Sequence, residues 1–238
     1  MTGAGSRVKT SKSDHLSPPG STRDPATGGI SLSKAGWRRA IRAAIAALDP
    51  GERSAQERSL IAAFPDLPGF AAAETVLLYV TAFPEELETR QFVAGAFDAG
   101  KQVLCPRVDR AARQLRLHAL GHAETDLMPG VLGIPEPRAD RPEVSPEAVD
   151  WVLVPGLGFD ERGYRLGRGA GHYDRLLARL RPDAVCWALC LGCQLVPQLP
   201  VEPHDLPLNG ITAPDRAVRG ARPRLDQSAR TSTAGGRA

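Results

Sequence analysis

The sequence predicts an α/β fold, a three-layer sandwich with a mostly parallel, Rossmann-like central sheet. Short apolar runs alternate with helix-like segments between residues 33 and 215, as expected of strands joined by crossover helices. Runs such as residues 184–191 are apolar throughout, which is typical of strands covered on both faces. With 238 residues, 42% of them hydrophobic, the chain is long enough to fill such a core.

Four segments carry helix signals. Ser33 is a good N-cap for a helix that runs to about residue 48, and a second helix is expected to follow to about residue 64. Apolar residues recur in the first helix at spacings of three and four residues, namely Trp37, Ile41, Ile45 and Leu48. A third helix is predicted over residues 89–99, ending at Gly100, and a fourth over residues 171–180.

Strand signals lie between these helices, at residues 74–80, 102–106, 150–155, 184–191 and 210–212. Residues 114–120 alternate apolar with polar residues, which predicts a half-exposed edge strand or the arm of a hairpin. Residues 121–149 are predicted to be mostly loop. Ligands of open α/β sheets bind beyond the carboxyl ends of the strands. We therefore expect the chemistry in the segments that follow them, at residues 81–89, 107, 155–174 and 194–205.

Charge and composition divide the chain into one domain, over residues 33–215, and two tails. Residues 1–32 and 216–238 are rich in small and polar residues, which predicts disorder because such segments bury too little apolar surface. The net charge is +2 for residues 1–33 and +5 for residues 216–238, which leaves −4 of the total of +3 for the body. No aromatic residue interrupts the basic tail for base stacking, so we expect a solvated tail, not a nucleic-acid partner.

No apolar run approaches the roughly 18 to 20 residues of a membrane span, and the N-terminus has no apolar core of a secretory signal. We expect a cytoplasmic protein with no membrane partner. Cys190 and Cys193 have the C-x-x-C spacing of metal and redox sites, but no second ligand pair accompanies them. Because they end an apolar run, we interpret them as structural cysteines, with a redox role as the alternative.

The most distinctive segment is the glycine-arginine loop, residues 152–174, where a buried strand leads through closely spaced glycines into a helix. Glycines let the backbone approach a ligand closely, and a helix N-terminus favours anions. Arg165 and Arg168 add positive charge, and Asp174 is a carboxylate placed to hold a divalent metal. The spacing fits neither the P-loop nor the dinucleotide fingerprint. The pattern favours a site for a nucleotide triphosphate, the alternative being a flexible surface turn.

The same loop resembles the signature of the 5-formyltetrahydrofolate cyclo-ligase family, also called methenyltetrahydrofolate synthetases. The similarity lies in residues 155–160 and 163–174, and it extends over about residues 34–214. Further matches occur in the family's order at Lys34 with Arg38, residues 86–89, Gly133-Ile-Pro-Glu-Pro137, residues 201–205 and Thr212.

The resemblance implies an ATP-dependent ligase of folate one-carbon metabolism, a monomer with Mg²⁺ as its metal. In this family ATP phosphorylates the formyl oxygen of 5-formyltetrahydrofolate, N10 attacks the activated carbon, and phosphate leaves to give 5,10-methenyltetrahydrofolate. By similarity, the catalytic residues are Arg168 and Tyr173, and the substrate is held by Glu86. Asp174 and Asp205 are the implied magnesium ligands. The implied nucleotide-binding residues are Lys34, Arg38, Gly167, Arg168, Gly169, Ala170, Gly171, His172, Tyr173 and Asp174.

Each of these residues also has a purely structural interpretation. Lys34 and Arg38 fit a solvated helix face, Glu86 fits a helix cap, and Asp205 fits a turn. His172 fits a polar residue of an exposed turn, and Tyr173 fits ordinary packing. Ala170, His172, Leu132 and Asn209 depart from the family's usual residues. These departures leave a second hypothesis, a non-catalytic or divergent paralogue that binds a nucleotide and a folate-like ligand.

Overall fold

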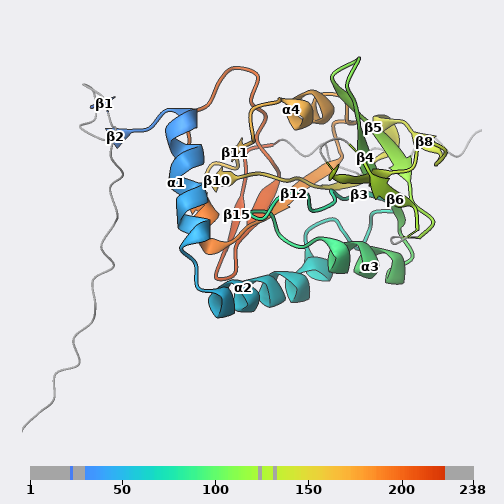
Figure 1. Cartoon of the computed structure of the whole chain (residues 1–238), viewed down its shortest axis with the longest axis horizontal. Helices are drawn as coiled ribbons and strands as arrows, with labels where there is room; N and C mark the ends of the chain where they lie inside the picture. Colours follow the sequence, from blue (N-terminus) through green and yellow to red (C-terminus); the bar gives the residue numbers. More distant parts are fainter. Residues whose placement is uncertain (1–21, 24–29, 123–124, 131–132, 223–238) are drawn as a thin grey trace, which may run out of the picture.

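A computed structural model describes residues 22–23, 30–122, 125–130 and 133–222. Its centre is an eight-stranded sheet with the strand order β15-β14-β12-β9-β3-β4-β5-β8 (Figure 1). The strands are β3 (Thr75–Leu77), β4 (Gln102–Asp109), β5 (Gln114–Ala119), β8 (Glu143–Val144), β9 (Trp151–Leu153), β12 (Val185–Leu189), β14 (Gly210–Thr212) and β15 (Ala217–Arg219). The five central strands, from β14 to β4, are parallel, and the outer ones are antiparallel. The predicted mostly parallel sheet is confirmed.

Helices cover both faces of this sheet, which makes three layers. On one side are α1 (Lys34–Ala46), α2 (Pro50–Ala63) and α3 (Arg90–Asp98), and on the other is α4 (His172–Leu177) (Figure 1). Alternate residues of β9 enter different cores: Trp151 packs with α1, α2 and α3, whereas Val152 packs with α4. Both side chains are fully buried, as expected of strands that read as continuous apolar runs.

The helix boundaries follow the predicted capping signals at most ends. The Ser33 side chain accepts a hydrogen bond from the backbone N–H of Gly36 at 3.2 Å and so caps α1. Gly100 adopts a φ of 71° just beyond α3, a conformation that glycine reaches without strain. The fourth helix is shorter than predicted and ends at Leu177 instead of residue 180. Just beyond it, the Arg179 N–H donates to the carbonyl oxygen of Leu176, three residues earlier, so the α-helical hydrogen-bond pattern has ended.

The cap of α1 yields a first testable prediction. Ser33→Ala removes the side-chain acceptor from Gly36, and we expect the free energy of unfolding to decrease by about 1 kcal/mol, the usual value of such a cap. Urea denaturation followed by circular dichroism measures the change. Ser54→Ala is the matched control, because the Ser54 hydroxyl makes one hydrogen bond among the described residues, as a donor to Pro50 O within α2. An equal loss in both variants would contradict the capping role.

The segment predicted as mostly loop, residues 121–149, contains short elements. These are β6 (Leu127–Pro129), β7 (Pro135–Pro137), β8 and a 3-10 turn, η3 (Pro146–Ala148). Because β8 pairs with β5, the prediction of an edge strand at residues 114–120 is wrong. The alternative, a hairpin arm, is confirmed by the antiparallel pairing of β5 with β4. The choice between an edge strand and a hairpin arm depended on where β8 lies, which the sequence of residues 114–120 does not show.

A second small sheet went unpredicted. It consists of β10 (Gly158–Asp160), β11 (Arg165–Leu166) and β13 (Leu195–Val196), in the order β11-β10-β13. The first two strands form a hairpin whose turn is organised by Asp160, which is fully buried. Its carboxylate accepts hydrogen bonds from the backbone N–H groups of Arg162, Tyr164 and Leu199. The hairpin leads directly into the glycine-arginine loop and fixes where that loop begins.

Paired strands lie beyond the predicted domain at both of its ends. β15 (Ala217–Arg219) pairs with β14, so the sheet extends past the boundary expected at residue 215. At the other end β1 (Thr22–Arg23) pairs with β2 (Ile30–Ser31). The remaining parts of the predicted disordered tails, residues 1–21, 24–29 and 223–238, lie outside the described residues.

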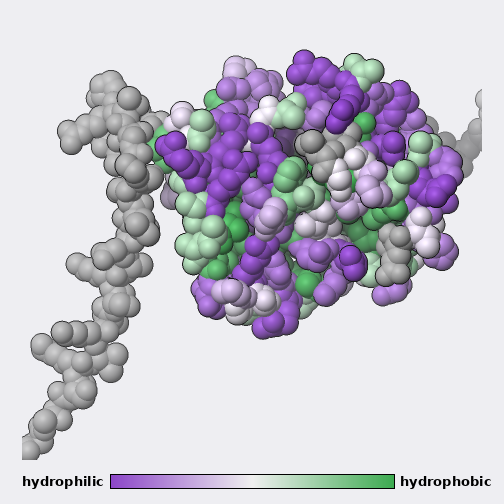
Figure 2. Space-filling view, in the orientation of Figure 1, coloured by the Kyte–Doolittle hydropathy of each residue, from purple (hydrophilic) through white to green (hydrophobic). Residues whose placement is uncertain are grey.

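The described surface carries few exposed large hydrophobic side chains, of which Met128 and Val201 are the examples. On the face shown in Figure 2, hydrophobic residues form only small patches among hydrophilic ones. Among the described helices, none is both long and apolar enough to span a membrane. All four cysteines are free, and Cys105, Cys186 and Cys190 are buried. Burial raises the pKa of the Cys190 thiol to about 12, which agrees with a structural cysteine.

Candidate active site

One cavity of about 700 Å³ lies beyond the carboxyl ends of the parallel strands. Every residue that the sequence assigned to a site lines it, although these residues come from α1, from the segment after β3, from the glycine-arginine loop and from the segment before β14. The cavity also has an apolar part, which includes Tyr79, Val108, Leu115 and Pro155. The cationic end of the cavity suits a highly charged ligand, and the apolar end suits a ring system.

The glycine-arginine loop depends on backbone conformations that favour glycine. Gly169 has a φ of 111° and Gly171 a φ of 66°, which side chains with a Cβ rarely adopt. Arg38 donates from Nε to the carbonyl oxygen of Gly167 at 2.9 Å. The loop is thus fastened to α1, and the α1 face that carries Lys34 and Arg38 adjoins it. The bare backbone of this loop leaves room for a ligand to approach closely.

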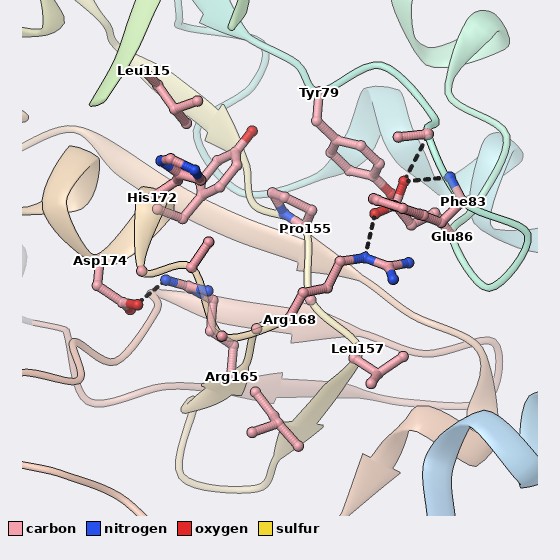
Figure 3. A pocket seen from close by; sticks show the side chains of 18 of the residues that line it. Tyr79, Phe83, Glu86, Leu115, Pro155, Leu157, Arg165, Arg168, His172 and Asp174 are labelled. Carbon is pink, nitrogen blue, oxygen red and sulfur yellow. Dashed lines mark hydrogen bonds and ion pairs between the residues drawn. The ribbon is translucent and has the colours of Figure 1, made fainter. Parts of the chain in front are cut away.

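Arg168 extends from the loop toward the segment after β3 (Figure 3). Its guanidinium carbon lies 3.4 Å from the ring centroid of Phe83. Nε donates to Glu86 Oε1 at 3.4 Å, and Nη1 donates to Glu85 Oε1 at 3.2 Å. The Nη2 atom is buried without a hydrogen-bond partner among the described residues, although Glu85 Oε2 is 3.2 Å away. Arg168 is therefore a held but incompletely satisfied cation that points into the cavity.

Glu86 is a mostly buried carboxylate at the edge of the apolar part. Its Oε2 accepts hydrogen bonds from the backbone N–H groups of Ala82 and Phe83, at 2.9 and 3.3 Å. Burial raises the pKa of Glu86 above its usual value, against the opposing effect of those N–H groups and of Arg168. A carboxyl group of this kind can bind a polar edge of a ligand in surroundings from which water is largely excluded.

Arg165 and Asp174 form an ion pair on the other side of the cavity (Figure 3). The Arg165 side chain is only 4% exposed, and burial lowers its pKa despite the nearby carboxylate of Asp174. Its guanidinium lies 5.8 Å from the ring centroid of Tyr173. The Tyr173 hydroxyl is buried without a hydrogen-bond partner among the described residues. Burial also raises the Tyr173 pKa, so the phenol is protonated at neutral pH.

Lys34 connects the start of α1 to the segment before β14. Its Nζ donates to Asp205 Oδ2 at 2.7 Å and lies 3.2 Å from Glu202 Oε2. Burial lowers the pKa of Lys34, but the hydrogen bonds and charges of Asp205 and Glu202 outweigh this effect and raise it. Glu202, His204 and Asp205 also place three potential ligand atoms within 4.8 Å of one another. Lys34 occupies part of that anionic cluster.

A model of the 5-formyltetrahydrofolate cyclo-ligase family matches residues 30–214 of this chain. The chain belongs to the 5-formyltetrahydrofolate cyclo-ligase family. The Escherichia coli K12 cyclo-ligase is 32% identical over 180 residues, covering 74% of this chain and 97% of the relative. The mouse cyclo-ligase is 28% identical and covers 78% and 96%. The structure is similar to that of Aquifex aeolicus 5,10-methenyltetrahydrofolate synthetase, with a TM-score of 0.69 at 28% identity, covering 82% of this chain and 96% of that one.

Membership of the cyclo-ligase family makes the chain an ATP-dependent ligase of folate one-carbon metabolism. The predicted family, fold class and enzyme class are confirmed, and the alternative of a non-catalytic paralogue is not favoured. The roles of the individual residues stay predictions. Of the departures from the family's usual residues, Leu132 lies outside the described residues. His172 and Ala170 line the cavity. The carbonyl oxygen of Ala170 accepts a hydrogen bond from Arg175 Nη2 at 3.0 Å, and His172 Nδ1 lies 3.3 Å from the same Nη2.

Several cavity residues were not assigned a role from the sequence. Phe83 and Glu85 lie just before the matched residues 86–89, so the resemblance did not assign them a role. Arg165 was noted only as a charge, because its burial and its pairing with Asp174 require the loop to fold back on itself. Glu202 has no signal of a role in the sequence except that it lies three residues before Asp205. The structure adds these four residues to the candidate site.

Proposed function

We propose that this cavity binds ATP and 5-formyltetrahydrofolate side by side and transfers the γ-phosphoryl group to the formyl oxygen. Attack of N10 on the activated carbon then closes the new ring, and the formyl oxygen leaves with the phosphate. The observation that carries this proposal is the meeting of four cations, Lys34, Arg38, Arg165 and Arg168, with an apolar pocket in one cavity. Phosphoryl transfer depends on such positioned charge more than on covalent help.

The triphosphate is assigned to the glycine-arginine loop and the start of α1. Backbone N–H groups around Gly169 and Gly171 can reach phosphate oxygens without steric hindrance from a Cβ. Lys34 and Arg38 lie one turn apart on α1, on the side of the cavity. Arg168 is the cation we assign to the transferring phosphoryl group, because its guanidinium lines the cavity and its Nη2 makes no hydrogen bond among the described residues.

The folate ring system is assigned to the apolar part, next to Glu86. The Glu86 carboxyl group would accept hydrogen bonds from the pterin. The Tyr173 hydroxyl, which has no hydrogen-bond partner among the described residues, could bind the ligand as well. Glu86 and Arg168 are in contact, so this arrangement brings the formyl oxygen close to the phosphoryl group it receives. When the reacting atoms are held next to each other in one site, the transfer does not depend on their meeting in solution.

Asp174 and Asp205 suit a magnesium ion, because both are carboxylates that line the phosphate end of the cavity. Each is paired with a cation, Arg165 or Lys34, so the ion would share these carboxylates with existing partners. When bound, Mg²⁺ neutralises phosphate oxygens during the transfer. These half-buried pairs keep both carboxylates in place before any ion arrives.

A direct assay tests the proposed function. The purified protein is mixed with 5-formyltetrahydrofolate and MgATP, and the absorbance of the methenyl product is followed. We expect a product that requires ATP and that disappears when EDTA removes Mg²⁺. Product formation that continues in EDTA would reject the magnesium assignment alone. No ATP-dependent chromophore at all would reject the cyclo-ligase reaction.

Replacement of Glu86 tests the folate assignment. We expect Glu86→Gln to raise KM for 5-formyltetrahydrofolate by about 10- to 100-fold, the usual cost of a lost charge-assisted hydrogen bond in a buried site. The KM for ATP should not rise, because Glu86 lies at the apolar end. Steady-state kinetics with each substrate varied in turn gives both values. An effect confined to the KM for ATP would contradict the assignment.

We also expect a cytoplasmic monomer. The four free cysteines support a reducing compartment, and the described surface carries few exposed large hydrophobic side chains. Light scattering after size exclusion measures the oligomeric state.

A further inference from the structure

Glu85 lies in the segment after β3, next to Glu86, and contacts two arginines. Its Oε1 accepts from Arg168 Nη1 at 3.2 Å and from Arg42 Nε at 3.0 Å, and its Oε2 is 3.2 Å from Arg168 Nη2. The side chain is 16% exposed. Burial raises the pKa of Glu85, but the hydrogen bonds from Arg168 and Arg42 outweigh burial and lower it. Glu85 is therefore a charged carboxylate shared by two cations.

The contacts with Glu85 and Glu86 occupy both edges of the Arg168 guanidinium. The Nη1 and Nη2 edge faces Glu85, and Nε faces Glu86. The flat side lies against the Phe83 ring. A phosphate that binds Arg168 through two parallel hydrogen bonds needs one of these edges. Arg168 must therefore exchange at least one carboxylate partner before it can serve a phosphoryl group.

Arg42 gives Glu85 a second partner that remains after such an exchange. It belongs to α1, one turn beyond Arg38, and pairs with Glu85 but does not line the cavity. The segment itself is braced by Arg53, which donates to the carbonyl oxygens of Pro84 and Glu86 at 2.8 Å each. Glu85 can thus lose Arg168 and stay both charged and in place, which keeps the cost of the exchange small.

We infer that Glu85 is a positioning residue that holds Arg168 over Phe83 and away from the phosphates until the substrate has engaged Glu86. This inference rests on the proposed role of Arg168 in phosphoryl transfer. Glu85 competes with the triphosphate for the same donors, so it weakens nucleotide binding by the free protein. When the substrate takes over Glu86, Arg168 loses its Nε contact and moves to the phosphate. The arrangement limits ATP hydrolysis in the absence of folate.

The variant Glu85→Gln tests this role, with Glu88→Gln as the matched control. Glu88 is exposed and lies three residues further along the chain, and its carboxylate accepts only from the N–H of Arg90 among the described residues. We expect Glu85→Gln to bind the non-hydrolysable analogue AMP-PNP with Mg²⁺ about 5-fold more tightly, because a competing charge-assisted pair is lost. ADP release without folate should rise by a similar factor, and Glu88→Gln should match the wild type. Calorimetry and a coupled ADP assay measure both.

Arg42 provides a second, independent test. In the wild-type background, Arg42→Gln leaves Glu85 to Arg168 alone and should weaken AMP-PNP binding about 3-fold by strengthening that pair. In the Glu85→Gln background the same change should have no effect. Equal effects of Arg42→Gln in both backgrounds, or an unchanged Kd in Glu85→Gln, would overturn the inference. Product formation by the wild type is measured separately. A failure of the proposed cyclo-ligase reaction can therefore be distinguished from a failure of the proposed role of Glu85.

Discussion

Arg168→Ala is expected to lower kcat by about three orders of magnitude, the usual effect of removing an arginine that stabilises a transferring phosphoryl group. The KM for 5-formyltetrahydrofolate should change little. Glu86 keeps its hydrogen bonds from Ala82 and Phe83, and Glu85 keeps Arg42. The carboxylates around Arg168 are therefore not left unpaired by its removal. Single-turnover and steady-state measurements of methenyl product separate this loss from a loss of binding.

Two further variants make the test specific. Arg168→Lys keeps the positive charge but loses the planar fork, so we expect an intermediate kcat. Arg179→Ala is the surface control, because Arg179 is exposed and its side chain donates to Gln114 alone among the described residues. It should retain wild-type kinetics. A kcat for Arg168→Ala within a few-fold of the wild type would remove Arg168 from the mechanism.

Asp160→Ala is expected to give the largest loss of stability, about 3–5 kcal/mol in the free energy of unfolding. Asp160 is fully buried and pairs with Arg162 at 2.7 Å. Its removal takes the acceptor from three backbone N–H groups, those of Arg162, Tyr164 and Leu199, and leaves Leu199 O as the one acceptor of the Arg162 side chain among the described residues. Buried donors that lose their acceptor are costly because no water replaces it. The hairpin before the glycine-arginine loop should also loosen.

Urea denaturation measures the loss, and Glu161→Ala is the matched control. Glu161 is the next residue in the same turn, and its side chain is 46% exposed in an ion pair with Arg216. Exposed pairs of this kind are worth roughly 0 to 1 kcal/mol. Similar unfolding free energies for the two variants would show that the turn does not depend on the buried carboxylate.

The helices and parallel strands could be predicted because their signals are local. Ser33 and Gly100 mark helix ends through their own side-chain and backbone chemistry, and the apolar run at residues 184–191 reads as a buried strand by itself. The second sheet and β8 gave no such signal. Strands of two or three residues carry too little pattern to predict, and they exist because distant segments supply their hydrogen-bond partners.

The candidate site divides in the same way. The glycine spacing, the arginines and Asp174 predict an anion site from the sequence, and the resemblance to one family predicts the chemical class of its ligands. Which charged residues pair with one another could not be predicted from the sequence. Each of these pairs joins different parts of the fold: Arg168 pairs with Glu85 and Glu86, Arg165 of β11 pairs with Asp174 of α4, and Lys34 pairs with Asp205.

The sequence by itself determined the α/β class, the position of the anion-binding loop and the family, because each depends on residue types at fixed spacings along the chain. The tertiary structure alone decided that these residues share one cavity and how their charges are neutralised within it. It also decided that Glu85 and Arg42 belong beside Arg168. The physical reason is that ion pairing and burial depend on distance in space, and the parallel sheet brings the ends of distant strands to one edge.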